Sequence, residues 1–197
     1  MHPPTVLLVP GSVRRDSAHR RLAAALSPLL VEHGVAAETI DLTDHPMPIY
    51  HGDEEEAHGV PDTAVELGGR IRSADGMILL SPEYNGGPSA LLKNTIDWLT
   101  RIERSIFSHL LVGLAATSPG GRGGVQGLAV MRGMLRHMSV PALEGELSVP
   151  SSYEAFVVGD GGVTFGKQED GEAATAFVHD YLVALEAHRR ALDTAST

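Results

Sequence analysis

Apolar residues fall along this chain in two alternating patterns. Residues 5–9 and 76–80 are short, unbroken apolar runs, which predict strands buried on both faces of a parallel sheet. Between such runs, apolar residues recur every three or four positions, as they do at Leu22, Ala25 and Leu29. That spacing places them on one face of an amphipathic helix. The pattern therefore predicts strands that alternate with helices.

Turn residues divide the rest of the chain in the same way. Strands are expected at residues 5–9, 35–42, 76–80, 110–116 and 140–149. Helices are expected at about residues 17–33, 61–73, 90–102, 125–138 and 172–192. This alternation implies an α/β fold with a parallel sheet and helices on both faces. The length of 197 residues suits a single domain over residues 1–197.

Local signals refine three parts of this prediction. Ser17 or Asp16 is expected to cap the first helix, and Pro28 to kink or restart it. Residues 43–59 contain an acidic run and several turn residues, so they are expected to form a long exposed loop. Residues 153–165 are expected to be an irregular or hairpin-like excursion.

Composition narrows the class of protein. The chain is 43% hydrophobic and carries a formal net charge of −10, which argues against general affinity for nucleic acid or anionic membranes. The absence of cysteine excludes disulfides, thiolate nucleophiles and cysteine-ligated metal clusters. Neither a signal peptide nor a stretch of about 20 apolar residues is present. A soluble cytoplasmic protein is therefore expected.

Three loops rich in turn residues follow the first, third and fourth predicted strands. Because the carboxyl ends of parallel strands lie at one sheet edge, these loops can line one crevice. The first loop, residues 11–20, places Ser12, Arg14 and Ser17 just before a helix N-terminus. Hydroxyl, guanidinium and N–H groups at the positive end of a helix form a natural phosphate site. An ordinary capped turn with surface arginines is the alternative.

The second and third loops combine glycine with polar side chains. The second loop carries Glu83, Tyr84 and Asn85 before two glycines, which permit close approach of a ligand. The third loop, residues 117–124, holds several glycines and Arg122, a candidate charge for a pyrophosphate or a 2′-phosphate. The alternatives are a tight turn with exposed polar residues and a flexible glycine loop with a solvated arginine.

Several familiar site patterns are missing or misplaced. The chain has no G-x-G-x-x-G dinucleotide fingerprint and no G-x-S-x-G nucleophile elbow. Residues 161–167 have P-loop spacing, but Gln168 replaces the required Ser or Thr. His45, His51 and His58 lie near acidic residues without a metal-binding spacing. We therefore expect a solvated loop there and no metal site.

The three loops together resemble the NAD(P)H-dependent FMN reductase family of flavodoxin-like proteins, which includes chromate, quinone and azo-dye reductases. Order and spacing match over about residues 5–140, and the block from Pro82 to Trp98 is the most specific part. The matching motifs are Gly11-Ser12-x-Arg14-x-x-Ser17, Ser81-Pro82-Glu83-Tyr84-Asn85, Leu92-Lys93-Asn94-x-Ile96-Asp97-Trp98 and Ser118-x-Gly120-x-x-Gly123-Gly124.

This resemblance implies a flavodoxin-like three-layer sandwich, with a five-stranded parallel sheet of order 2-1-3-4-5 and FMN at its carboxyl edge. Ser12, Arg14 and Ser17 would hold the FMN phosphate. His19 stands beside them, where the family usually has Asn. The residues implied to border the flavin ring are Pro82, Glu83, Tyr84, Asn85, Gly86, Ser118, Gly120, Gly123 and Gly124.

The resemblance also implies that NAD(P)H is the co-substrate. Hydride would pass through flavin N5 to a small acceptor, such as free flavin, a quinone, an azo compound or chromate. No side-chain acid or base is required, and Glu83 and Tyr84 are the candidates to touch a substrate. A homodimer or homotetramer is expected. The alternatives are a non-enzymatic flavodoxin-like electron carrier, whose acidic charge would suit basic partners, and a flavin-free interaction domain.

Overall fold

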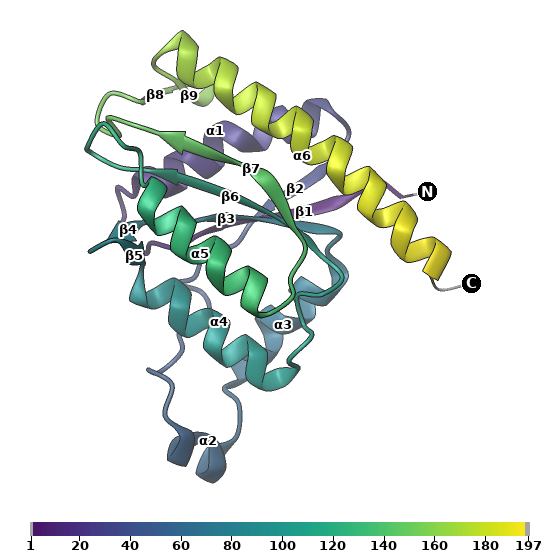
Figure 1. The fold of residues 1–197 in the computed structure, drawn as a ribbon. Helices are drawn as coiled ribbons and strands as arrows, with labels where there is room; N and C mark the ends of the chain where they lie inside the picture. Colours follow the sequence, from purple (N-terminus) through teal and green to yellow (C-terminus); the bar gives the residue numbers. More distant parts are fainter. Residues whose placement is uncertain (1, 196–197) are drawn as a thin grey trace.

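A five-stranded parallel sheet forms the centre of the computed structural model, which describes residues 2–195 (Figure 1). The strands lie in the order β2-β1-β3-β6-β7. Because β4 and β5 form a separate small hairpin, this is the predicted order 2-1-3-4-5, and the flavodoxin-like arrangement is confirmed. The strands of the sheet are β1 (Thr5–Pro10), β2 (Ala36–Thr39), β3 (Gly76–Leu80), β6 (Leu111–Thr117) and β7 (Ala142–Val149).

Burial on both faces explains the unbroken apolar runs. Successive side chains of a strand point to opposite faces, so Leu7 and Val9 of β1 enter one core. Val6 and Leu8, their neighbours in the sequence, enter the other. A parallel sheet of this kind needs helices on both sides to exclude water.

Helices α1 and α6 cover one face of the sheet, and α3, α4 and α5 cover the other (Figure 1). On α6, Phe177, Tyr181 and Leu185 are buried against the sheet. Tyr181 Oη donates a hydrogen bond to the carbonyl of Leu111 at 3.0 Å, which ties α6 to β6. The helices are α1 (Ala18–Glu32), α2 (Gly52–His58), α3 (Asp62–Ser73), α4 (Ala90–Ile102), α5 (Val125–His137) and α6 (Gln168–Ala195). Two hairpins complete the fold, β4 (Glu83–Tyr84) with β5 (Gly87–Pro88), and β8 (Phe156–Gly159) with β9 (Gly162–Phe165).

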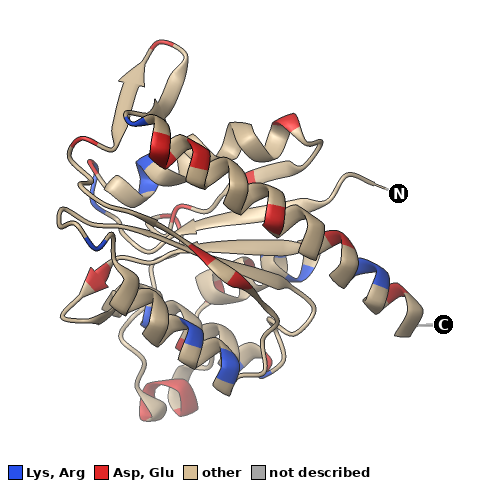
Figure 2. Ribbon diagram, turned by 45° about the horizontal axis from the view of Figure 1, so that its top comes forward, with Lys and Arg blue, Asp and Glu red and all other residues tan. Residues whose placement is uncertain are grey.

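Residues 43–59 differ from the predicted exposed loop. They contain the short helix α2, whose acidic residues stand out in Figure 2 and complement the positive end of the helix. His45 is only 4% exposed, so the expectation of a solvated loop is wrong at that position. The preceding main chain docks onto α4, because the carbonyl of Pro48 accepts hydrogen bonds from Asn94 Nδ2 at 2.8 Å and Trp98 Nε1 at 2.7 Å.

The ends of other elements follow the sequence with small changes. Ser17 caps α1, and the helix continues through Pro28 without being divided. The hairpin-like excursion is confirmed as β8 and β9. Helix α6 begins at Gln168, four residues earlier than predicted. Acidic residues in its first turn favour that start, and the N–H of Gly171 bonds the carbonyl of Lys167, the residue just before the helix, at 3.2 Å.

Two kinds of feature are missing from residues 2–195. No helix in this range is long and apolar enough to cross a membrane. The same residues contain no group of three or more His, Asp or Glu side chains arranged to hold a metal ion.

Candidate functional site

A pocket of about 190 Å³ opens where β1, β3 and β6 end. Each of the three predicted loops reaches it, and so does a fourth segment, which follows β7. Larger hollows of about 610 and 920 Å³ are lined mainly by α1 and α6, away from the strand ends that α/β sheets use for ligands. The pocket is lined by Ser12, Arg14, Asp16, Ser17, Ala18, His19, Arg21, Pro82, Glu83, Tyr84, Thr117, Ser118, Pro119, Ser152 and Tyr153.

Most of the predicted site residues therefore line one pocket. Those outside its lining are Arg122 and the turn residues Asn85, Gly86, Gly120, Gly123 and Gly124. The segment after β7 was not predicted to reach the pocket, although that strand ends at the same sheet edge. The signal for this segment was its place after the fifth predicted strand, because loops after parallel strands meet at one edge of the sheet. Among the remaining lining residues, Asp16, Ala18, Thr117 and Pro119 lie within the predicted loops but were not named as site residues, whereas Arg21, Ser152 and Tyr153 lie outside those loops.

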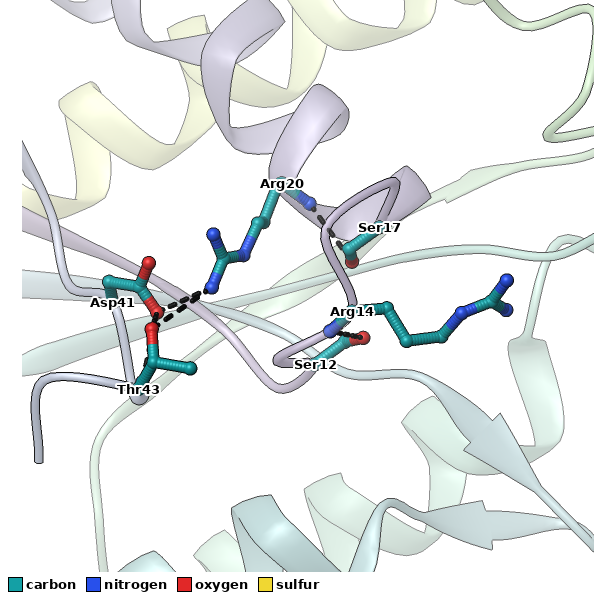
Figure 3. A network of polar contacts seen from close by, with 6 residues as sticks. All are labelled: Ser12, Arg14, Ser17, Arg20, Asp41 and Thr43. Carbon is teal, nitrogen blue, oxygen red and sulfur yellow. Dashed lines mark hydrogen bonds and ion pairs between the residues drawn. The ribbon is translucent and has the colours of Figure 1, made fainter. Parts of the chain in front are cut away.

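Two arginines near the start of α1 point in opposite directions (Figure 3). Arg20 Nη2 donates to Asp41 at 2.5 Å and to Thr43 Oγ1 at 3.3 Å. Burial alone would raise the pKa of Asp41, but hydrogen bonds from Thr43 and the charge of Arg20 outweigh it and lower that pKa. Arg20 is thereby held at the loop after β2. Arg14 lines the pocket and has no ion-pair partner within residues 2–195.

The N-terminus of α1 faces the pocket beside Arg14. Ser17 Oγ accepts a hydrogen bond from the N–H of Arg20, and Ser12 Oγ accepts one from the N–H of Arg14, each at 3.4 Å. The side chain of Asp16 is 88% exposed, so its charge is largely screened by water. Unsatisfied N–H groups, the positive helix end and a guanidinium group together form a candidate anion site.

His19 lies deeper in the same wall and is 7% exposed. Its Nε2 accepts a hydrogen bond from the main-chain N–H of Thr117 at 3.4 Å. Burial lowers the pKa of His19 to about 4, against the opposing effect of its hydrogen bond to the main chain of Ser81. The imidazole is therefore neutral at pH near 7, and it joins α1 to the ends of β3 and β6 rather than supplying a positive charge.

The second loop is a two-residue hairpin. Asn85 and Gly86, between β4 and β5, have φ angles of 54° and 75°. Asn-Gly is the pair that such a turn favours, so the sequence carried a signal for this hairpin. Ser89 Oγ donates to the carbonyl of Gly11 at 2.7 Å, which fixes the second loop against the first.

Glu83 is turned toward α5. Its Oε2 accepts hydrogen bonds from the main-chain N–H groups of Gln126 and Gly127, both at 3.0 Å. The N-cap residue of α5 is Gly124, which has no side chain to do this. The carboxylate thus satisfies two N–H groups and complements the positive helix end. Tyr84, which is 53% exposed, is left facing solvent at the pocket.

The glycines of the third loop have different local roles. Gly123 has a φ of 58°, and a Cβ there would come within 2.3 Å of Ser148 Oγ. Gly124 has a φ of 94°, and a Cβ there would lie 2.8 Å from Ala116 Cβ. Gly120 has open space around the same position. Backbone conformation and close packing therefore require glycine at the first two positions and not at the third.

Thr117, at the end of β6, is 2% exposed, and its hydroxyl has no hydrogen-bond partner among the described residues. A buried hydroxyl without a partner is costly, and this one lines the pocket. Across the opening, the N–H of Ser152 bonds the carbonyl of Ser118 at 2.9 Å. Its neighbour Tyr153 is 83% exposed. The segment after β7 is thereby fixed to the third loop with an aromatic side chain at the opening.

The arrangement fits an elongated ligand with a phosphate at one end. The candidate anion site lies at the N-terminus of α1, and the unsatisfied hydroxyl of Thr117 offers a further polar contact in the same pocket. Tyr84 and Tyr153 add aromatic surface at the opening. The pocket lining contains no cysteine.

Comparisons with known proteins agree with this geometry. The family model for NADPH-dependent FMN reductase matches residues 4–154. The chain is 30% identical over 151 residues to an NADPH azoreductase of Bacillus sp. (strain OY1-2), covering 77% of this chain and 76% of the relative. It is 31% identical over 150 residues to a quinone reductase of Pseudomonas putida, covering 76% of each. The flavoenzyme NAD(P)H:(acceptor) oxidoreductase FerB of Paracoccus denitrificans superposes with a TM-score of 0.78 and 25% identity, covering 94% of this chain and 98% of that one.

Proposed function

This chain belongs to the NADPH-dependent FMN reductase family, and on that premise we propose that the pocket at the strand ends is its FMN and substrate site. The protein is an NAD(P)H-dependent oxidoreductase with FMN as its cofactor. The observation that carries the assignment of the site is the convergence of Arg14, the N-terminus of α1 and the unsatisfied hydroxyl of Thr117 on one pocket.

The phosphate of FMN is assigned to the N-terminus of α1. Ser12 and Ser17 offer hydroxyl groups there, and Arg14 offers a guanidinium group without a competing ion pair within residues 2–195. A guanidinium group binds phosphate through charge-assisted hydrogen bonds. His19 lies beside them as a neutral ring, already bonded to the N–H of Thr117. We therefore assign it the role of holding the wall in place.

The flavin ring is assigned to the space between the second and third loops. Pro82 and Tyr84 lie on one side, and Thr117 and Ser118 on the other. Asn85, Gly86, Gly120, Gly123 and Gly124 form the turns that set the shape of these walls. Their main-chain groups, rather than their side chains, would contact the ring.

Bound FMN supplies the redox chemistry, by accepting hydride from NAD(P)H and passing electrons to an acceptor. The residues of the pocket bind and orient the reactants. Tyr84 and Tyr153 offer aromatic surface for a flat substrate at the opening. The carboxylate of Glu83 is bonded to α5, so it is not placed as a general acid or base. Proton exchange is left to the reacting groups and to water.

A small flat molecule, such as a quinone, an azo compound or free flavin, is the proposed acceptor. The names of the relatives, quinone reductase and azoreductase, support this choice. The net charge of −10 makes an anion such as chromate a weaker candidate. We also propose that the protein forms a homodimer or homotetramer. The exposed apolar side chains of Val125 and Val130 on α5 support this assembly, because a subunit contact could bury them. The proposed location is the cytoplasm, where NAD(P)H is supplied.

Purified protein gives the test. We expect it to bind FMN with the visible absorption of a flavoprotein, and to oxidise NADPH in the presence of menadione without any added reductase. Arg14→Ala should lose FMN affinity while Arg15→Ala keeps it, because Arg15 is outside the pocket lining. Protein that takes up no added FMN would overturn the assignment. Protein that binds FMN and oxidises neither NADH nor NADPH would instead be an electron carrier.

A further inference from the structure

Glu83 caps the N-terminus of α5, which lacks a side-chain cap of its own. Helix α5 begins after Gly124, which has a φ of 94° and provides no side-chain cap. The N–H groups of Gln126 and Gly127 instead receive the carboxylate of Glu83, which lies 43 and 44 residues earlier in the chain. A carboxylate from a different loop therefore occupies the positive end of this helix.

The packing around this contact is close. A Cβ on Gly127 would come within 3.1–3.3 Å of the Cβ, Cγ and Cα atoms of Glu83. Glycine at this position thus lets the main chain of the hairpin β4–β5 lie directly on α5. Directly after the hairpin, Ser89 Oγ donates a hydrogen bond to the carbonyl of Gly11 at 2.7 Å. The hairpin is held between the first loop and α5, and Glu83 provides the charged attachment.

We propose that Glu83 is a positioning residue that fixes the hairpin β4–β5 on α5 and lowers the midpoint potential of FMN bound in the pocket. The inference rests on the proposed function, since it requires FMN at this site. Glu83 lines the pocket, so its charge acts on whatever is bound there. Its effect on the helix and its effect on the cofactor come from the same carboxylate.

The sign of the electrostatic effect follows from charge balance. Transfer of a hydride brings two electrons and one proton to the flavin ring, so the ring gains one negative charge. The positive end of a helix, roughly +0.5 elementary charge, would favour this change. The full negative charge of Glu83 more than offsets that end, so it opposes the change. The reduced cofactor is thereby made a stronger reductant toward an acceptor.

Two substitutions separate the structural effect from the electrostatic effect. Glu83→Gln keeps a side-chain oxygen that can accept both N–H groups but removes the charge. We expect FMN affinity within about twofold of the wild type and a midpoint potential about 30 mV more positive, which is a tenfold change in the equilibrium constant of a two-electron couple. Glu83→Ala removes the attachment as well, and FMN should bind about tenfold more weakly. Glu66→Gln, which removes an exposed carboxylate from α3, is the control for net charge.

Hydrogen exchange on the apoprotein tests the attachment without FMN. The N–H groups of Gln126 and Gly127 should exchange faster in Glu83→Ala and stay protected in Glu83→Gln. Unchanged protection in Glu83→Ala would overturn the positioning role, whether or not FMN binds.

If wild-type protein binds FMN and the midpoint potential of Glu83→Gln equals that of Glu66→Gln, the electrostatic role is overturned and the proposed function stands. If wild-type protein binds no FMN, the proposed function fails together with the effect on potential, and the exchange result alone decides the attachment.

Discussion

The imidazole Nε2 of His19 accepts a hydrogen bond from the main-chain N–H of Thr117 at 3.4 Å. This bond joins the first helix to the end of β6, at the wall of the pocket. Only a neutral imidazole can accept it, and burial lowers the pKa of His19 to about 4. Protonation of this ring is therefore coupled to the stability of the fold.

We expect acid to destabilise the apoprotein partly through His19. The pKa is 6.5 for an unperturbed histidine and about 4 in the folded chain, so the unfolded chain binds the proton first. The contribution of His19 to stability is complete above pH 6.5 and is lost as the pH falls toward 4. The full loss is about 3 kcal/mol.

Urea unfolding of the wild type and His19→Asn at about pH 7 and about pH 5 measures this effect. Asparagine offers an amide donor and acceptor but does not titrate in this range. The free energy of unfolding of His19→Asn should therefore depend less on pH than that of the wild type. Equal pH dependence in the two proteins would show that His19 is not the group responsible.

Replacing Arg14 should weaken FMN binding. The guanidinium group lines the pocket and lacks an ion-pair partner in the described chain, so its loss removes a charge-assisted contact to phosphate. We expect Arg14→Ala to cost about 1.5–3 kcal/mol of FMN binding energy. Arg15→Ala is the matched control, and fluorescence titration with FMN measures both. The phosphate assignment does not survive if both variants bind FMN equally well.

Alanine at two glycines of the third loop should give opposite results. In Gly123→Ala, the new Cβ meets Ser148 Oγ and the residue must keep a φ of 58°, so we expect a loss of about 2 kcal/mol or more of folding free energy. In Gly120→Ala, the new Cβ meets nothing within 4 Å, and the change should stay within about 0.5 kcal/mol. Denaturant unfolding of both apoproteins checks this prediction. Similar losses of unfolding free energy in the two variants would show that the packing around Gly123 does not require glycine.

Thr117→Val should separate stability from cofactor binding. Valine removes a buried hydroxyl that has no partner in residues 2–195, so the apoprotein should be as stable as the wild type or more stable. FMN should bind more weakly, by about 0.5–1.5 kcal/mol, if the hydroxyl contacts it. In the control Thr95→Val, the lost hydroxyl bonds the Leu91 carbonyl at 2.9 Å. This control should lower stability and leave FMN affinity unchanged. Unchanged FMN affinity in Thr117→Val would show that the Thr117 hydroxyl does not contact FMN.

The local sequence was sufficient for the sheet strands, for the helices that cover them and for the sheet edge at which the pocket lies. Residues 5–9 and 76–80 are apolar because both faces of their strands are buried, so pattern alone predicts them. The turn residues after these strands mark loops, and the geometry of parallel strands brings the loops to one edge. The segment ending in Tyr153 was missed because its residues show no local site pattern, although it follows a strand at the same edge.

The sequence by itself determined the order of the five sheet strands and the three loops that meet at one sheet edge, and it supports the proposed phosphate site at Ser12, Arg14 and Ser17. Only the tertiary structure decided which polar side chains remain available to a ligand. Glu83 is bonded to α5 and His19 to Thr117, 98 residues away. Such pairs join segments that the sheet brings together, and no local pattern predicts them, because a side chain's partner depends on the packing of the whole fold.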